Sequence, residues 1–164
     1  MTGGTHPMNI DVRTAVPADY DRIVALLTQI AALHHAGRPD IFADGGSKFS
    51  HDALARLAED PDVCIFAADA DDTVCAGYLI CRVKRTDHAP LLPASVMWVE
   101  DLFVDPDCRR QGIATALVER AKQLGAERGC ARLELNVWAF NESAIAFYRR
   151  CGLGVQRQVM ELPL

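Results

Sequence analysis

The sequence lacks any apolar run long enough to cross a membrane, and its first ten residues lack the apolar core of a secretory leader. Its six cysteines are scattered without a Cys-x-x-Cys pair, and no His, Cys and Asp cluster has the spacing of metal ligands. We therefore expect a cytoplasmic protein with reduced thiols, no metal ion and no membrane contact.

A surplus of positive charge is also missing. The formal net charge is −5 at pH 7, whereas a protein that binds duplex nucleic acid is expected to carry a basic surplus. Nucleic acid is therefore not an expected partner. The mild acidity favours cationic small molecules or basic peptides instead.

What the sequence does contain is the composition of one globular domain. Half of its 164 residues are hydrophobic, enough for a sizeable core, and no repeat or linker divides the chain. We expect residues 1–7 to form a flexible N-terminal tail and residues 8–164 to form a single domain.

Periodicity and turn residues predict the order of the elements. Strands are expected over 9–16, 62–70, 73–85, 95–104 and 131–138, with one or two short strands near the C-terminus. Helices are expected over about 17–35, over 51–59 with Ser50 as cap, over about 112–128 and over 141–151. Leu133, Leu135 and Val137 should share one face of their strand. This order indicates an α/β or α+β fold with a mixed sheet.

The segment CRRQGIATAL (108–117) places Arg109 and Arg110 before Gly112, at the expected start of a helix. The first amides of a helix have no internal partner, and together with the helix dipole they favour an anion. Gly112 and the small Ala114 let a phosphate approach the backbone. A solvated basic turn is the alternative. Neither G-x-x-x-x-G-K-[ST] nor G-x-G-x-x-G is present, so a P-loop and a dinucleotide fold are not expected.

Two segments together resemble the GCN5-related N-acetyltransferase (GNAT) superfamily. VEDLFVDPDCRRQGIATALVERA resembles its acetyl-CoA-binding segment, because the pattern [RQ]-x-x-G-x-[GA] is met by Arg109, Gly112 and Ala114. LNVWAFNESAIAFYRRCGL resembles its second signature, met by Asn141, Ala144, Phe147, Tyr148 and Gly152. The resemblance covers roughly residues 8–160. It implies a mixed, mostly antiparallel sheet of six or seven strands with two splayed central strands, flanked by about four helices.

The resemblance also implies which anion is bound, namely the pyrophosphate of acetyl-CoA. The amides expected to hold it belong to Arg110, Gln111, Gly112, Ile113, Ala114 and Thr115. The preceding strand is expected to pair with the pantetheine amides through Leu102, Phe103 and Val104. Asn141 matches a residue that contacts the cofactor, although a helix N-cap is an equally good interpretation.

Transfer of an acyl group to an amine needs a base for the ammonium proton and an acid for the leaving thiolate. By its position Tyr148 matches the general acid of the family, although a tyrosine on this helical stripe is also typical of a core. It is also counted among the cofactor-binding residues.

Glu100 and Asp101 are adjacent carboxylates inside an apolar strand, where charge is costly unless it meets a cavity or a partner. Adjacent strand residues face opposite sides, so one of them should face the cleft unless a bulge re-aims both. We expect Glu100 to share a face with Trp98, Leu102 and Val104. EDLFV resembles in particular the diamine acetyltransferase branch, in which a glutamate at this position is the proposed base. Glu100 is therefore the expected base and Asp101 the second candidate.

The acceptor side has weaker candidates. Asp101, His34 near the end of the first helix, and Asn136 could bind the acceptor. The resemblance implies an N-acetyltransferase that moves an acetyl group from acetyl-CoA to a primary amine by direct attack in a ternary complex. A small cationic molecule is the favoured acceptor. The alternatives are a protein N-terminal or lysine acetyltransferase and a catalytically silent acyl-CoA-binding regulatory domain. A homodimer is kept as a possibility.

Overall fold

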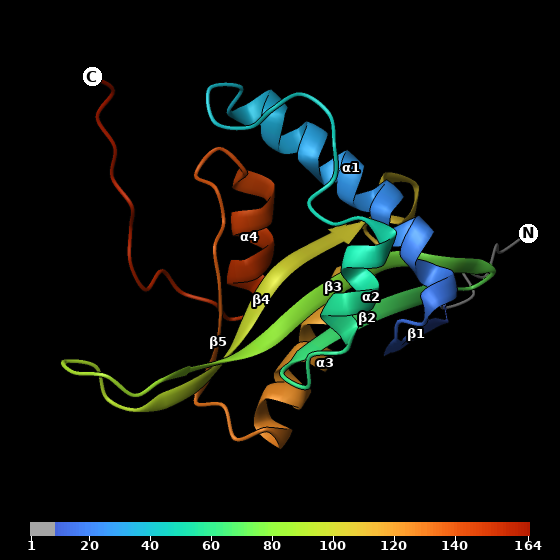
Figure 1. Cartoon of the computed structure of the whole chain (residues 1–164). Coiled ribbons are helices and arrows are strands. Elements are labelled where there is room, and N and C mark those ends of the chain that lie inside the picture. Colours follow the sequence, from blue (N-terminus) through green and yellow to red (C-terminus); the bar gives the residue numbers. More distant parts are fainter. Residues whose placement is uncertain (1–8) are drawn as a thin grey trace, which may run out of the picture.

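The computed structural model describes residues 9–164, so the tail expected over residues 1–7 lies outside the described part. The elements follow one another along the chain (Figure 1) as β1 Ile10–Thr14, α1 Tyr20–Gly37, α2 His51–Ala58, β2 Val63–Ala70, β3 Thr73–Thr86, β4 Ala94–Val104, α3 Ile113–Glu127, β5 Arg132–Leu135 and α4 Glu142–Arg150. Short 3-10 turns at Pro17–Asp19 and Pro106–Cys108 precede α1 and α3. Within the described residues, no helix is both long and apolar enough to cross a bilayer.

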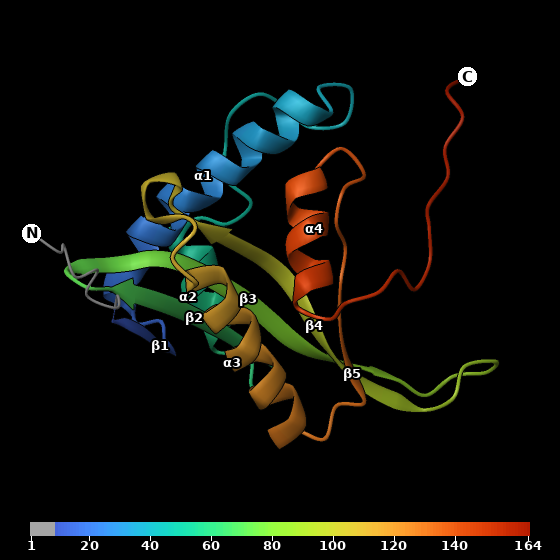
Figure 2. The ribbon, with the colours of Figure 1, turned by 180° about the vertical axis from the view of Figure 1, so that it is seen from behind.

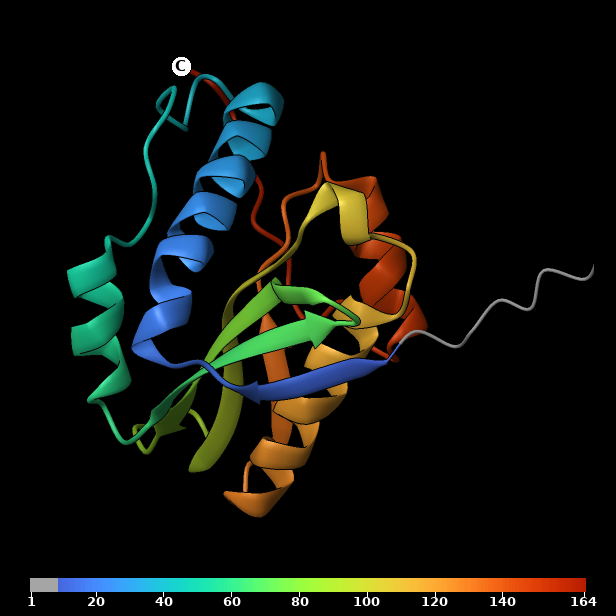
Figure 3. The ribbon, with the colours of Figure 1, turned by 90° about the vertical axis from the view of Figure 1, so that its right-hand side faces the viewer.

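The sheet separates two helical layers. Its strand order is β1-β2-β3-β4-β5, and neighbouring strands are antiparallel except for the parallel pair β4 and β5. Figure 3 shows α1 and α2 on one face of the sheet and α3 and α4 on the other, and Figure 2 views the molecule from the α3 side. Each face carries an apolar core, built around Ile23, Leu26, Leu27 and Tyr78 on the α1 side and around Leu79, Met97, Leu117 and Val118 on the α3 side.

Capping residues fix the starts of two helices. Ser50 Oγ accepts a hydrogen bond from Ala53 N at 3.1 Å, and Asn141 Oδ1 accepts one from Ala144 N at 3.2 Å. These bonds satisfy amides that the first turn of a helix leaves without a partner. The cap expected at Ser50 and the N-cap interpretation of Asn141 are both confirmed.

Strand β4 and the edge strand β5 lie side by side over a short stretch only. Their pairs run from Val96 with Arg132 to Val99 with Leu135. Beyond that point β4 continues to Val104 and pairs with β3 alone. The expected splay is confirmed, and it leaves one backbone edge of β4 without a strand partner.

Two expectations about the C-terminal part are wrong. The described residues form five strands rather than six or seven, because no strand follows α4. Strand β5 ends at Leu135, so Val137 lies beyond it and is 38% exposed, whereas Leu133 and Leu135 pack against the α3-side core. Residues 153–164 instead run as an extended segment away from the sheet (Figure 1).

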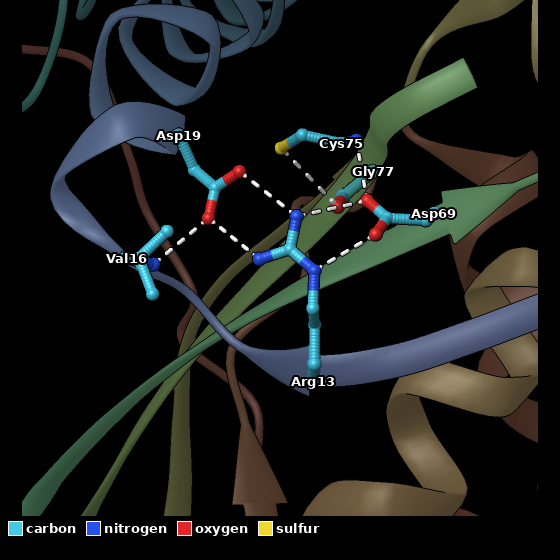
Figure 4. Close-up of polar contacts among 6 residues, drawn as sticks. All are labelled: Arg13, Val16, Asp19, Asp69, Cys75 and Gly77. Atoms are coloured by element: carbon cyan, nitrogen blue, oxygen red, sulfur yellow. Dashed lines mark hydrogen bonds and ion pairs between the residues drawn. The ribbon is translucent and has the colours of Figure 1, made fainter. Parts of the chain in front are cut away.

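An ion-pair cluster ties β1 to the start of α1 and to the β2–β3 hairpin (Figure 4). Arg13 lies between Asp19 and Asp69, at nitrogen–oxygen distances of 2.7 and 2.8 Å. Val16 N donates to Asp19, and Cys75 N donates to Asp69. The hydrogen bonds from Arg13 hold the pKa of Asp19 below its usual value, although burial opposes them. The cluster therefore anchors the beginning of the helix whose far end borders the candidate site.

Candidate active site

The turn between β4 and α3 presents bare backbone amides. Gly112 is the N-cap of α3 with a φ of 89°, and Arg110 has a φ of 62°. Gly112 has no side chain that could cap the helix, and within residues 9–164 no hydrogen bond engages the amides of Ile113, Ala114 and Thr115. Because these amides stand at the positive end of a 15-residue helix, the turn suits an anion.

The two arginines of this turn are not equivalent. Arg109 Nε donates to the Val104 carbonyl at 3.2 Å, and its guanidinium lies 5.1 Å from the centroid of the Phe103 ring. Arg110 and Gln111 are exposed to solvent. Arg109 therefore braces the turn against β4, and the amides rather than this guanidinium are left free to bind.

The unpaired edge of β4 leads directly into this turn. Leu102, Phe103 and Val104 pair with β3 on one side, and they lie beyond the last β4–β5 pair on the other. Leu102 is half-buried, and Phe103 and Val104 are buried. An extended ligand that carries amides could pair with this edge while its phosphate end meets the start of α3.

A β-bulge at Glu100 decides where the two carboxylates point. Ile80 pairs with Asp101 and Cys81 pairs with Val99, so Glu100 is an extra residue in β4. A regular strand would send Glu100 and Asp101 to opposite faces. With the bulge, both face the α1 side.

Contacts on each side of the sheet support this assignment. Lys48 Nζ, from the loop between α1 and α2, lies 3.7 Å from Glu100 Oε2 and 3.6 Å from Asp101 Oδ2. Leu102 and Val104 pack into the core on the α3 side. The expectation that Glu100 shares a face with Leu102 and Val104 is therefore wrong, because it assumed a strand without a bulge.

Asp101 is the more enclosed of the two carboxylates. Its side chain is 9% exposed, and the Tyr78 hydroxyl donates to Oδ1 at 3.0 Å. Burial raises the pKa of Asp101, although the Lys48 charge and the Tyr78 hydrogen bond oppose this. A carboxylate whose pKa is raised is a better proton acceptor near neutral pH.

Glu100 already has a cationic partner. Its Oε1 lies 2.8 Å from Arg82 Nε, and its side chain is 21% exposed. Within residues 9–164 no guanidinium contacts Asp101, so the two carboxylates have different surroundings.

Tyr148 approaches the same region from the other face of the sheet. It lies on α4 and packs against the α3-side core. Burial and, to a smaller extent, the negative charge of Asp101 together raise the pKa of Tyr148 to about 12. The phenol therefore keeps its proton at neutral pH. Asp101 and Tyr148 flank the point where β4 and β5 separate.

An aromatic cluster of His34, Phe42, Trp138 and Phe140 lies near the site, and its His34 is close enough to Asp101 for each group to affect the pKa of the other. The His34 ring stacks on Phe42 at 4.9 Å between centroids, and Phe42 meets Trp138 edge-on at 5.1 Å. Phe140 lies 6.3 Å from His34. Burial lowers the pKa of His34, although the nearby Asp101 charge opposes this, and the net shift favours the neutral imidazole.

Sequence reasoning missed two members of the site. Tyr78 carried a signal, since a tyrosine inside an apolar strand needs a partner for its hydroxyl. Lys48 carried none, because the loop over residues 38–50 has no periodicity. Asn136 is exposed directly after β5, and its side chain forms no hydrogen bond with residues 9–164. In the same part of the chain, no three His, Cys, Asp or Glu side chains are gathered as for a metal ion.

Comparison with known proteins gives the same assignment as the two signatures. The sequence profile of the acetyltransferase (GNAT) family matches residues 29–153. The chain belongs to the GNAT acetyltransferase family. Among solved structures, a point mutant of the BH1408 protein from Bacillus halodurans is similar, with a TM-score of 0.90, 26% sequence identity and coverage of 94% of this chain and 99% of that one.

Curated GNAT relatives match over shorter stretches. An uncharacterised N-acetyltransferase of Methanocaldococcus jannaschii is 44% identical over 54 residues, which are 33% of this chain and 24% of that protein. The thialysine N-epsilon-acetyltransferase of Bos taurus is 30% identical over 56 residues, 34% of this chain and 33% of that protein. The chain thus spans a third or less of the length of these two relatives.

Proposed function

We propose that this GNAT protein transfers an acetyl group from acetyl-CoA to the primary amine of a small, cationic acceptor, by direct attack in a ternary complex. The observation that carries the proposal is the unpaired β4 edge that runs into the unsatisfied amides at the start of α3. Few ligands need a strand-like arm and a phosphate site in that order, and coenzyme A is one of them.

The donor side is assigned from the backbone. Amides of residues 110–115 would hold the pyrophosphate, and the edge over Leu102, Phe103 and Val104 would pair with the pantetheine arm. Asn141 is already used as the α4 cap, so any contact with the cofactor would be additional to that role. When bound, acetyl-CoA supplies an activated acetyl thioester.

The proton transfers are assigned to Asp101 and Tyr148. The acceptor ammonium loses a proton to Asp101, and the amine nitrogen then forms a bond to the acetyl carbon while the carbon–sulfur bond breaks. Tyr148 donates its proton to the leaving thiolate. The amide nitrogen releases its second proton to solvent, from which the Tyr148 phenolate is protonated again. Asp101 is preferred as base because it is buried and unpaired with any guanidinium, whereas Glu100 is held by Arg82 and stays the second candidate.

The class of acceptor is assigned from the negative charge of the two carboxylates and from the aromatic rings near them. Two carboxylates at the bulge attract a cation, and the aromatic cluster offers ring faces that bind cations. The name of the thialysine N-epsilon-acetyltransferase relative describes an amine on a short alkyl chain, and we extend this class of acceptor to the present chain. His34, being neutral, would border the acceptor without repelling it.

Two alternatives of different classes are separated by experiment. A protein N-terminal or lysine acetyltransferase would use the same donor site with a peptide acceptor. A silent regulatory domain would bind acyl-CoA and transfer nothing, but a buried carboxylate and a protonated phenol at the strand separation favour transfer.

The deciding experiment is a thiol-release assay with acetyl-CoA and a panel of amines. The panel contains spermidine, lysine, thialysine, an aminoglycoside and short peptides with free N-termini. We expect release with the small diamines and none with N-acetylated peptides that lack lysine. Calorimetric binding of CoA without release for any amine would contradict the enzyme and support the regulatory domain.

We also propose that the protein is cytoplasmic and forms a homodimer through its C-terminal segment. Val155, Val159, Met160 and Leu162 of this segment are each at least 67% exposed, and no described strand covers the outer edge of β5. An exposed apolar segment and an open sheet edge are each a pairing surface. Light scattering after gel filtration should give twice the mass of one chain, and the mass of a single chain would contradict the dimer.

A further inference from the structure

Lys48 lies in the candidate acceptor site although it belongs to the protein itself. Its Nζ donates a hydrogen bond to the Glu100 carbonyl at 3.2 Å and lies 3.6 Å from Asp101 Oδ2. The side chain is 46% exposed, so it is reachable from solvent. The loop that carries it contains Gly45 and Gly46, both with positive φ and with open space around them.

The position of this amine is the one that an acceptor must take. A nitrogen that gives its proton to Asp101 has to come within hydrogen-bond distance of the carboxylate, at about 3 Å. Lys48 Nζ stands roughly half an ångström beyond that distance. It approaches from the α1 side, and Tyr148 approaches from the opposite face of the sheet.

The other lysines of the chain are held elsewhere. The sequence contains three lysines, at positions 48, 84 and 122. Lys84 Nζ lies over the Trp98 ring, 3.6 Å from its centroid, and Lys122 Nζ pairs with Glu119 at 2.7 Å. Lys48 is thus the lysine that contacts the proposed base.

We infer that Lys48 is a site of self-acetylation, modified within its own chain when acetyl-CoA is bound and no external amine is present. The inference rests on the proposed function, since it uses the same donor and the same base. Lys48 gives one proton to Asp101, its nitrogen bonds to the acetyl carbon, the carbon–sulfur bond breaks, and the thiolate takes the Tyr148 proton. The nitrogen then releases its second proton to solvent, from which the Tyr148 phenolate is protonated again. The product is an uncharged amide, which no longer pairs with the two carboxylates.

The test is mass spectrometry of the whole protein after incubation with acetyl-CoA alone. We expect one added mass of about 42 Da, the acetyl group of a modified lysine, located by peptide mapping at Lys48. Because the transfer is internal, the fraction modified per unit time should not change over a tenfold range of protein concentration. Lys48→Arg keeps the charge but offers a guanidinium that stays protonated, so it should lose the modification.

Matched variants separate this reaction from chemical background. Lys122→Arg should keep the modification at Lys48, and Asp101→Asn should lose it. Equal labelling of all three lysines, or labelling that Asp101→Asn leaves unchanged, would overturn the inference. Release of thiol with the amine panel while Lys48 stays unmodified would overturn it and leave the proposed function intact. Absence of both reactions would overturn the two together.

Discussion

The proposed donor side and the proposed acceptor side of the site differ in what forms them. The donor side is backbone: the unpaired edge of β4 and the first amides of α3. The acceptor side is side chain: two carboxylates at a bulge, a lysine from a loop, and rings from three segments. A site formed by backbone groups can be predicted from residues that are close together in the sequence. A site formed by side chains depends on which segments, distant in the sequence, come together in the fold. The difference decides what each mutation should do.

The largest effect is expected on the acceptor side, at the base. Asp101→Asn removes the proton acceptor, and we expect kcat to fall by about 1,000-fold. In the unmodified protein, kcat/KM should fall as the pH drops through the Asp101 pKa. That fall should begin at a higher pH than for an ordinary carboxylate, because burial raises this pKa. The pH–rate profile of the variant should lack this limb.

Stability provides the control for this variant. A carboxyl group whose pKa is raised by folding favours the protonated fold, so stability falls as the pH rises through that pKa. At pH 7 an uncharged asparagine should therefore leave the melting temperature equal or higher. Glu100→Gln, beside it at the bulge, should change kcat by less than about tenfold. A larger loss for Glu100→Gln than for Asp101→Asn would reverse the assignment of the base.

The bulge also marks the limit of sequence analysis. Helix caps at Ser50 and Asn141 are visible because a side chain and the next amides lie close in sequence. The bulge at Glu100 depends on the register between β4 and β3, and no residue type within β4 predicts it. The alternation over 131–138 likewise predicts a strand longer than β5, because β5 ends where β4 diverges and no longer pairs with it.

On the donor side the largest effect is expected at the N-cap of α3. Gly112 has a φ of 89°, and the atom nearest to an added Cβ is Ile10 Cδ1 at 3.7 Å. Gly112→Asp would therefore cause no steric clash, but it would strain the backbone and place a negative charge beside the pyrophosphate. The left-handed conformation costs about 1–2 kcal/mol, and a carboxylate repels the pyrophosphate. We expect about 100-fold weaker binding of acetyl-CoA by calorimetry, or about 2.7 kcal/mol.

Gly129 offers a matched position at the other end of α3. Its φ is 69° and an added Cβ would meet nothing within 4 Å. Gly129→Asp therefore brings the same strain and charge without an anion site, and its acetyl-CoA affinity should stay within about twofold of the unmodified protein. If the two variants lose affinity equally, the start of α3 is not where the cofactor binds.

A smaller effect is expected where the two sides meet. Tyr148→Phe removes the proton donor for the thiolate, but water can replace it in part, so we expect kcat to fall by about 30-fold. The affinity for CoA should be unchanged, because the backbone carries the binding. Tyr20→Phe removes a phenol from another buried tyrosine, at the opposite end of α1, and should leave kcat unchanged. If Tyr148→Phe had the same kcat as Tyr20→Phe, Tyr148 would not be the proton donor.

The smallest effect is expected for the exposed positive charge of the turn before α3. Arg110 is exposed, and an exposed guanidinium contributes little because water and salt screen it. Arg110→Ala should weaken acetyl-CoA binding by about threefold in dilute buffer, and the difference should shrink as salt is added. Arg109 is a poorer test, because its side chain holds the turn against the Val104 carbonyl. If Arg110→Ala lost as much affinity as Gly112→Asp, side chains would carry the anion, and the contrast between a backbone donor site and a side-chain acceptor site would fail.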